Sequence, residues 1–356
     1  MTERCQHFGI CGGCTFQGLP EAEYRAAKRD EVVRALTKQG VVAEVADIVT
    51  VPPKSRRRAV LNVARRRGVV EVGFHPFKSH DIVDMHECLV LTPALFAFTA
   101  ALREAMPALL ADGQDAEARV TEADNGLDLA FRAQPKLNGE RIAALARIAP
   151  RLKAIRITWN GALAFESAAP TVRLGKADVK LPQDTFLQPT RAGEAALVAQ
   201  VRSIVAGAKN VADLFSGCGT FSLPLAEDAR VQAVEREQAM LDALAAAARA
   251  TPGLKPVTVA RRDLFKIPLG PAELAPFDAV VLDPPRAGAE AQARQLAAAK
   301  IPRLAYVSCD AASFARDAKI LVDGGYRIGA VTPVDQFLWS SHIELVAAFT
   351  RERARR

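Results

Sequence analysis

The chain has 356 residues, which is long enough for two hydrophobic cores, since single cores stop growing at roughly 250 to 300 residues. Half of the residues are hydrophobic and 24% are charged, which excludes a disordered or low-complexity protein. The formal net charge is +7, and no apolar run reaches the roughly 20 residues of a membrane span. We therefore expect a cytoplasmic protein with reduced thiols, no membrane partner and no obligate protein partner.

Three cysteines crowd the start of the chain, at Cys5, Cys11 and Cys14 of "CQHFGICGGC". Gly12 and Gly13 let the backbone curl so that the sulfurs converge, and the spacing indicates a metal loop. Cys88 is the expected fourth ligand, because the other two cysteines lie in the second half of the chain. Four thiolates suit a [4Fe-4S] cluster or a closed zinc site. Zinc with three cysteines and one histidine is a further possibility, with candidates at His7, His75, His80 and His86.

Residues 20–40 are predicted to form a helix that ends at Gly40, with apolar positions at Tyr24, Val32, Val33 and Leu36. Short strands are expected from there to about residue 77. Eight basic residues lie between Lys54 and Lys78, against one acid. Two arginine triplets, at 56–58 and 65–67, flank "AVLNVA" and are expected at neighbouring ends of a hairpin. Such a surface suits a nucleic-acid backbone, although an ordinary solvated face is the alternative.

The second half of the chain has a regular pattern in which apolar strands alternate with Ala-rich helices. This pattern predicts an α/β fold with a doubly wound, Rossmann-like parallel sheet. Before it, helix-like and strand-like pieces mix, and "ITWNGALAF" predicts a hairpin around Asn160 and Gly161. We expect a smaller α+β domain over residues 1–185 and the doubly wound domain over residues 186–356.

A glycine loop follows the first strand of that second half, in "DLFSGCGTFS", with Gly217 and Gly219. Ser222 replaces the third glycine of a dinucleotide fingerprint, which argues against a bound pyrophosphate. Glu235 ends the next strand, where a carboxylate could accept the ribose hydroxyls of a nucleoside. Asp263 could reach an adenine edge. An exposed strand-end Glu and a loop Asp are the plainer interpretations.

Two neighbouring strands end in "DPPRAG" and "LAYVSCD". Ligands of such sheets bind beyond the carboxyl ends of the strands, so Asp283 and Cys309 are expected at one edge, with Arg286 presented by a stiff loop. A single cysteine at a strand end is more often a small buried hydrophobe. The two motifs side by side favour a functional site.

The ordered set "FLQPT", "DLFSGCGTFSLPLA", "DPPRAG", "YVSCDAASFARD" and "HIELVAAF" resembles the S-adenosylmethionine-dependent RNA uracil-C5 methyltransferases. The N-terminal cysteines resemble the iron-sulfur branch that acts on 23S ribosomal RNA. The resemblance extends from Cys5 to about Phe349. It implies a class I methyltransferase domain preceded by the smaller domain with an iron-sulfur loop. It also implies S-adenosylmethionine and a [4Fe-4S] cluster as cofactors.

The resemblance implies a role for each matching position. Cys309 falls on the nucleophile and Glu344 on the base that removes a proton. Positions that bind the methyl donor are Gln188, Phe215, Glu235, Asp263 and Asp283, and the cluster ligands are Cys5, Cys11, Cys14 and Cys88. The implied reaction makes 5-methyluridine in 23S rRNA through a covalent bond between Cys309 and C6 of the uracil, because C5 alone is too weak a nucleophile to attack a sulfonium methyl.

The chain departs from the family pattern at two positions. Asp310 follows the cysteine where Asn-Pro is common, and a carboxylate there would raise the thiol pKa if it pointed inward. Thr190 stands where Asn is usual. These departures motivate one alternative, a non-catalytic RNA-binding or ribosome-assembly factor; a transfer RNA substrate is another, and a cluster-based redox protein is poorly supported. No small RNA-binding barrel precedes the cysteines, so RNA contact is expected from the first 185 residues, above all from the basic hairpin.

Overall fold

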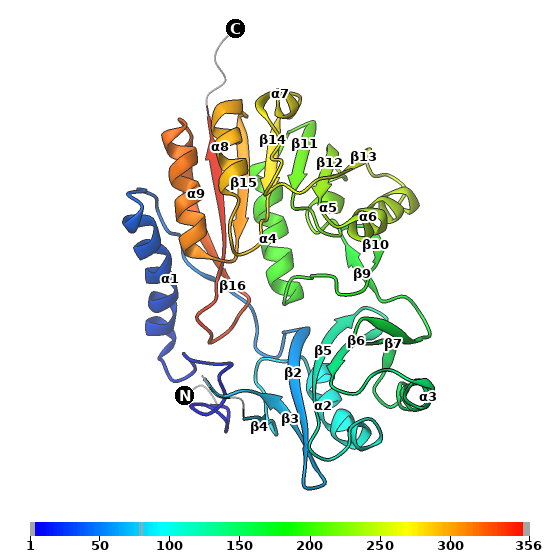
Figure 1. Ribbon diagram of the computed structural model, residues 1–356. Helices are drawn as coiled ribbons and strands as arrows, with labels where there is room; N and C mark the ends of the chain where they lie inside the picture. Colours follow the sequence, from blue (N-terminus) through cyan, green and yellow to red (C-terminus); the bar gives the residue numbers. More distant parts are fainter. Residues whose placement is uncertain (1–3, 78, 80, 352–356) are drawn as a thin grey trace.

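The computed structural model describes residues 4–77, 79 and 81–351. Two sheets lie end to end, the larger one built mainly from the second half of the chain (Figure 1). A separate hairpin of β9 (Thr171–Leu174) and β10 (Ala177–Lys180) packs against a helix of the larger sheet. Among the residues that the structure describes, no helix combines the length and the hydropathy needed to cross a bilayer.

The seven-stranded sheet has the order β4-β3-β2-β5-β6-β7-β8 and is antiparallel except for the β6–β7 pair. Its strands are β2 (Arg58–Arg66), β3 (Val69–Phe74), β4 (Val83–Asp84), β5 (Asp115–Ala123), β6 (Gly126–Ala133), β7 (Ala154–Trp159) and β8 (Ala162–Glu166). The helices are α2 (Pro93–Ala105), η1 (Met106–Ala108) and α3 (Gly139–Ile148). Asn160 and Gly161 join β7 to β8 with φ of 51° and 83°, so the predicted hairpin and its turn are confirmed.

The eight-stranded sheet has the order β1-β16-β17-β15-β14-β11-β12-β13. Its strands are β1 (Val49–Thr50), β11 (Asn210–Leu214), β12 (Arg230–Glu235), β13 (Val257–Arg261), β14 (Ala279–Leu282), β15 (Arg303–Ser308), β16 (Arg327–Asp335) and β17 (Glu344–Thr350). The helices are α1 (Glu21–Lys38), α4 (Arg191–Ile204), α5 (Ser222–Leu225), α6 (Gln238–Ala250), α7 (Pro271–Leu274), α8 (Glu290–Ala299) and α9 (Ala311–Asp323).

The expected parallel pairing holds for β11 to β15, the five strands that alternate with helices. β17 differs, because it is antiparallel to both β15 and β16, which share the direction of the other strands. β16 is a strand that the alternation did not indicate, since Gly329 and Pro333 interrupt its apolar pattern. The antiparallel β17 brings its first residue, Glu344, to the edge at which the parallel strands end.

The helix predicted for residues 20–40 is confirmed as α1, which buries Tyr24, Val32 and Leu36 but leaves Val33 37% exposed. It lies beside α9, and β1 then pairs with β16 (Figure 1). Residues 21–50 therefore lie with the larger sheet. The boundary near residue 185 stays a prediction. That prediction assigns residues 21–50 to the smaller domain, whereas they contact the larger sheet.

The expectation of one basic surface at neighbouring hairpin ends is wrong. The triplets lie at opposite ends of β2, roughly 30 Å apart at about 3.3 Å per residue. Arg57 is only 1% exposed, and its Nη2 lies 2.6 Å from Glu194 Oε2. The buried guanidinium thus joins β2 to α4, whereas Arg66 and Arg67 are exposed at the β2–β3 turn. Lys78 lies outside the described residues.

Candidate active site

The carboxyl ends of β11, β12, β14 and β15 surround a cavity of about 470 Å³. The five residues expected at the methyl donor all line it: Gln188, Phe215, Glu235, Asp263 and Asp283. Cys309 and Glu344 line it as well. Ser308 pairs with Leu345 in the β15–β17 register, which places the thiol and the carboxyl group on adjacent strands. The structure therefore gathers all seven residues at one edge of the sheet.

The glycine loop has the backbone that its sequence suggests. Gly217 and Gly219 have φ of 54° and 98°, and a Cβ on Gly219 would lie 3.0 Å from Leu244. The Gly217 N–H donates to Glu235 Oε2 at 3.1 Å, which holds the strand-end carboxylate against the loop. Ser222, in place of the third glycine, donates to the buried Asp213 at 2.5 Å.

Glu344 is buried, and Cys309 beside it is half-buried. Burial, followed by the charge of Asp283, raises the pKa of Glu344 to about 8. Burial, followed by Glu344 and Asp283, raises the pKa of Cys309 to about 12, while Arg286 acts in the opposite direction. Burial and Asp213 raise the pKa of Asp283 to about 7. Asp213, Asp283 and Glu344 lie close together, and Arg286 is the cation that acts on Glu344 and Cys309. A site with this excess of carboxyl groups favours a cationic ligand.

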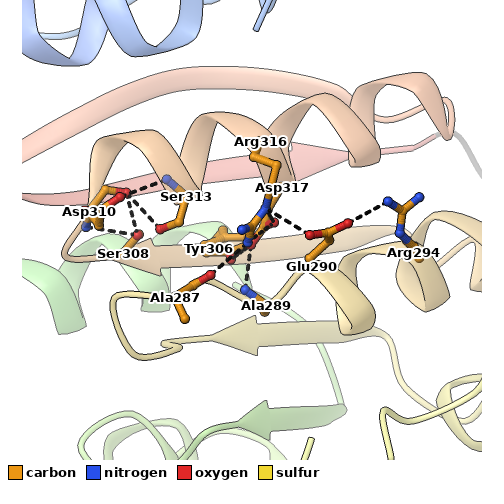
Figure 2. Close-up of polar contacts among 10 residues, drawn as sticks. All are labelled: Ala287, Ala289, Glu290, Arg294, Tyr306, Ser308, Asp310, Ser313, Arg316 and Asp317. Atoms are coloured by element: carbon orange, nitrogen blue, oxygen red, sulfur yellow. Dashed lines mark hydrogen bonds and ion pairs between the residues drawn. The ribbon is translucent and has the colours of Figure 1, made fainter. Parts of the chain in front are cut away.

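The two departures from the family pattern both cap helices. Asp310 is the N-cap of α9 and accepts from Ser313 N at 2.8 Å, beside Ser308 (Figure 2). Thr190 is the N-cap of α4 and accepts from Gly193 N at 2.9 Å. The Asp310 carboxylate is thus engaged by a helix N-terminus, and the charges that raise the Cys309 pKa are Glu344 and Asp283.

The loop of "DPPRAG" is held by α9. The buried Asp317 accepts from Ala289 N at 2.6 Å and from Tyr306 OH at 2.5 Å, and Arg316 donates to Ala287 O at 2.9 Å (Figure 2). Beyond this anchor, Arg286 Nη2 lies 2.6 Å from His342 Nδ1. Burial, followed by Arg286, lowers the pKa of His342, so the imidazole is neutral and accepts from the guanidinium.

A second cavity, of about 570 Å³, opens on the other side of the thiol. It shares Phe186, Arg286, Cys309 and Glu344 with the first, and Cys5, Cys11, Cys14 and Cys88 line it too. Neighbouring thiols add to burial in raising the pKa of Cys14, to about 12, which places the four sulfurs within electrostatic reach. Within the described ranges, no set of three or more His, Cys, Asp or Glu is arranged to hold a metal ion. His80 lies outside those ranges.

The comparisons with known proteins identify the family. The family model described as tRNA (Uracil-5-)-methyltransferase matches residues 260–352. An uncharacterized RNA methyltransferase of Brucella suis biovar 1 is 44% identical over 350 residues, covering 98% of this chain and 84% of the relative. The 23S rRNA (uracil(1939)-C(5))-methyltransferase RlmD of Chromohalobacter salexigens is 33% identical, covering 99% and 77%. This chain belongs to the RNA uracil-C5 methyltransferase family.

A solved structure supports the fold of this methyltransferase. It is the Pyrococcus abyssi tRNA (uracil-54, C5)-methyltransferase in complex with S-adenosyl-L-homocysteine, with a TM-score of 0.74 and 23% identity, covering 96% of this chain and 85% of that chain. At this identity the likeness shows the fold alone. The family consists of enzymes that use S-adenosylmethionine, so the chain is an S-adenosylmethionine-dependent RNA (uracil-C5-)-methyltransferase.

The methyltransferase site contains residues that sequence reasoning missed. Phe265 lies with its ring centroid 5.4 Å from that of Phe215 in the first cavity. Gln336, which is 1% exposed, donates to Gln188 Oε1 at 2.6 Å. Phe265 follows Asp263 closely and could have been noticed there. Gln336 belongs to no motif, and only the pairing of β16 with β17 brings it to the site.

Proposed function

We propose that this enzyme methylates C5 of a uridine in 23S rRNA, with Cys309 as the nucleophile and Glu344 as the base. One observation supports the proposal most: Cys309 and Glu344 line both cavities. The first cavity has a glycine loop and a strand-end carboxylate suited to a nucleoside. The second opens toward the seven-stranded sheet, from which a uridine flipped out of its stack can enter.

The proposed steps balance as an addition, a transfer and an elimination. The Cys309 thiol loses its proton to solvent, the thiolate sulfur bonds to C6 of the uracil, and the electron pair of the C5–C6 double bond moves into an enolate. C5 then takes the methyl group as the sulfonium–methyl bond breaks. Glu344 removes the C5 proton, and the electron pair of that bond restores the double bond as sulfur leaves C6.

The first cavity fits S-adenosylmethionine by its chemistry, since it offers carboxyl groups to a ligand that carries a sulfonium and an ammonium. Glu235 would accept the ribose hydroxyls, and Phe215 and Phe265 would contact the adenine, with Asp263 at its edge. Gln188 and Asp283 would face the charged end. A cation bound there lowers the pKa values of Glu344 and Cys309, which promotes formation of both reactive anions.

We also propose that Cys5, Cys11, Cys14 and Cys88 hold a [4Fe-4S] cluster. Their placement around one cavity supports this, although the ligand arrangement is not preformed. The cluster would supply a covalent staple between the N-terminal loop and the β4–α2 segment, and no step of methyl transfer needs it. Anaerobically purified protein should be brown with a broad visible absorption band. A colourless protein that contains one zinc ion would contradict the cluster.

The RNA class rests on the relative that is named for 23S rRNA and is 33% identical. The family model and the solved structure are both named for tRNA methyltransferases, so tRNA is the second candidate. The deciding experiment measures methyl transfer from labelled S-adenosylmethionine to 23S rRNA and to tRNA, both lacking 5-methyluridine, with nucleoside analysis.

Label in 5-methyluridine of 23S rRNA, lost in Cys309→Ala, is the expected result. Cys218→Ala is the matched control, because Cys218 is a buried thiol of the same cavity that lies on the glycine loop rather than on a strand end. Label in tRNA alone would show that tRNA, and not 23S rRNA, is the substrate. Undiminished transfer by Cys309→Ala would overturn the nucleophile.

A further inference from the structure

Gln336 lies between the two halves of the site, on the connection that leads from β16 to Glu344. Its Nε2 donates to Gln188 Oε1 at 2.6 Å, and Gln188 Nε2 in turn lies 3.4 Å from Asp283 Oδ2. Val334, two residues before Gln336, pairs with Glu344 in the β16–β17 register, and the Gln336 side chain lowers the pKa of that carboxyl group against the larger effect of burial. The amide therefore connects the proposed methyl-donor side to the proposed base.

The amide has little freedom to lie elsewhere. Gln336 is 1% exposed and Gln188 is 2% exposed. A Cβ on Gly193 would lie 2.4 Å from Gln336 Oε1, so α4 has a glycine where the amide packs. Glycine inside a helix costs about 1 kcal/mol relative to alanine, a cost that the space for this side chain explains.

The orientation of the amide follows from its neighbours. Nε2 donates to Gln188, while Gln336 Oε1 and Glu344 Oε2 both have no hydrogen-bond partner within the described part of the chain. A primary amide has two N–H donors, enough for both acceptors. Because Gln188 Oε1 accepts from Gln336, its own nitrogen is directed toward Asp283.

We propose that Gln336 is a positioning residue that couples binding of the methyl donor to the readiness of the base. It holds Gln188 in the orientation that faces Asp283, and its second N–H is the donor available to the unpartnered oxygen of Glu344. The inference rests on the proposed roles of Gln188 and Glu344. Asp283, Arg286 and Cys309 are the other ionisable groups that face Glu344.

Gln336→Met tests this proposal, because methionine has a similar length and no amide. We expect the Kd for S-adenosylhomocysteine, measured by calorimetry without RNA, to rise about tenfold, as for the loss of one well-made hydrogen bond. We also expect the acid side of the pH profile for single-turnover transfer to move to higher pH, because Glu344 loses the neighbouring N–H donor that favours its ionised form.

Gln292→Met is the matched control. Gln292 is fully buried and exchanges two hydrogen bonds with the backbone of Leu269, away from the site. It should lower the melting temperature and leave the Kd and the pH profile unchanged. Gly193→Ala is a second test, since the new methyl group displaces the Gln336 amide without removing it, and it should weaken binding in the same direction.

Unchanged binding and an unchanged pH profile in both Gln336→Met and Gly193→Ala would overturn the proposal, as would equal losses in the Gln292→Met control. Binding of S-adenosylhomocysteine needs neither RNA nor turnover. The binding test therefore decides the role of Gln336 toward Gln188 even if wild-type protein transfers no methyl group to RNA, a result that would count against the proposed function alone.

Discussion

Glu344 is a carboxyl group at the start of a strand, 2% exposed, and its pKa is raised to about 8. In the unfolded chain a glutamate titrates at about 4.3. The folded state therefore binds a proton that the unfolded state has released at neutral pH. The resulting stability is fully present below the unfolded pKa and is lost as the pH rises through the folded pKa.

Replacing Glu344 with glutamine should remove this dependence, because the amide never ionises. We expect Glu344→Gln to raise the melting temperature by several degrees at a pH of about 9 and to change it little at a pH of about 4, relative to wild type. Thermal unfolding of both proteins at the two pH values checks this. The same difference at both would show that ionisation of Glu344 is not the cause.

The role of Asp310 depends on whether its carboxylate points toward the N-terminus of α9 or toward Cys309. Its carboxylate caps α9, so Asp310→Ala should cost about 1 kcal/mol of unfolding free energy and leave the pH dependence of Cys309 alkylation unchanged. Asn138→Ala, which removes the N-cap of α3, is the control with a similar stability cost. A shift of the alkylation profile toward lower pH in Asp310→Ala alone would restore the hypothesis of an inward-facing carboxylate.

At the scale of elements, the arginines at the two ends of β2 have different surroundings. At its start, Arg57 donates to Gln188 O at 3.1 Å and pairs with Glu194, while Arg58 donates to Leu187 O at 2.5 Å. These contacts join the smaller sheet to the segment that carries Gln188. At its far end Arg66 and Arg67 lie in the open turn to β3.

Removing the buried guanidinium should be costly, because Glu194 would be left without its charge partner. We expect Arg57→Met to lower the unfolding free energy by about 3 to 5 kcal/mol, and Arg66→Met by less than about 0.5 kcal/mol. Adding Glu194→Leu to Arg57→Met should recover much of the loss. Urea unfolding of the four proteins measures this, and a small loss in Arg57→Met would mean that the pair contributes little.

The β2–β3 turn is an exposed part of the basic segment and is available to RNA. Changing both Arg66 and Arg67 to alanine should weaken RNA binding and lower the slope of log affinity against log salt by about 2, while leaving binding of S-adenosylhomocysteine unchanged. Filter binding over a range of salt checks both statements. An unchanged slope would place the RNA backbone on another surface.

At the scale of the whole molecule, the N-terminal segment lies across the connection from β16 to β17. Thr15 N and Phe16 N both donate to Trp339 O, at 2.7 and 2.9 Å. Lys28 is fully buried, pairs with Asp335 at 2.6 Å and donates to His342 O at 2.5 Å. The segment that would hold the cluster thus fixes the loop that ends at Glu344.

Loss of the cluster should therefore make the loop of residues 337–343 more mobile. If the four cysteines hold a cluster, Cys88→Ser should speed amide hydrogen exchange in residues 337–343 and leave β11 and β12 unchanged. Mass spectrometry of the exchanged protein checks this. Equal protection in wild type and variant would show that the loop is held by Lys28 and by Tyr24, whose hydroxyl accepts from Trp339 N at 2.9 Å, without help from the cysteines.

The sequence by itself determined α1, the β7–β8 hairpin and the five parallel strands, because local periodicity and turn chemistry depend on residues that are close in the chain. Strand-end motifs indicated Glu235, Asp283 and Cys309, whereas the family resemblance supplied Gln188, Phe215 and Glu344. Tertiary structure decided the antiparallel β16–β17 pair, the burial of Arg57 and the place of Gln336. It also turned Asp310 toward a helix N-terminus. Each of these depends on a partner far away in the chain, and charge or polarity alone does not reveal whether a side chain meets solvent or such a partner.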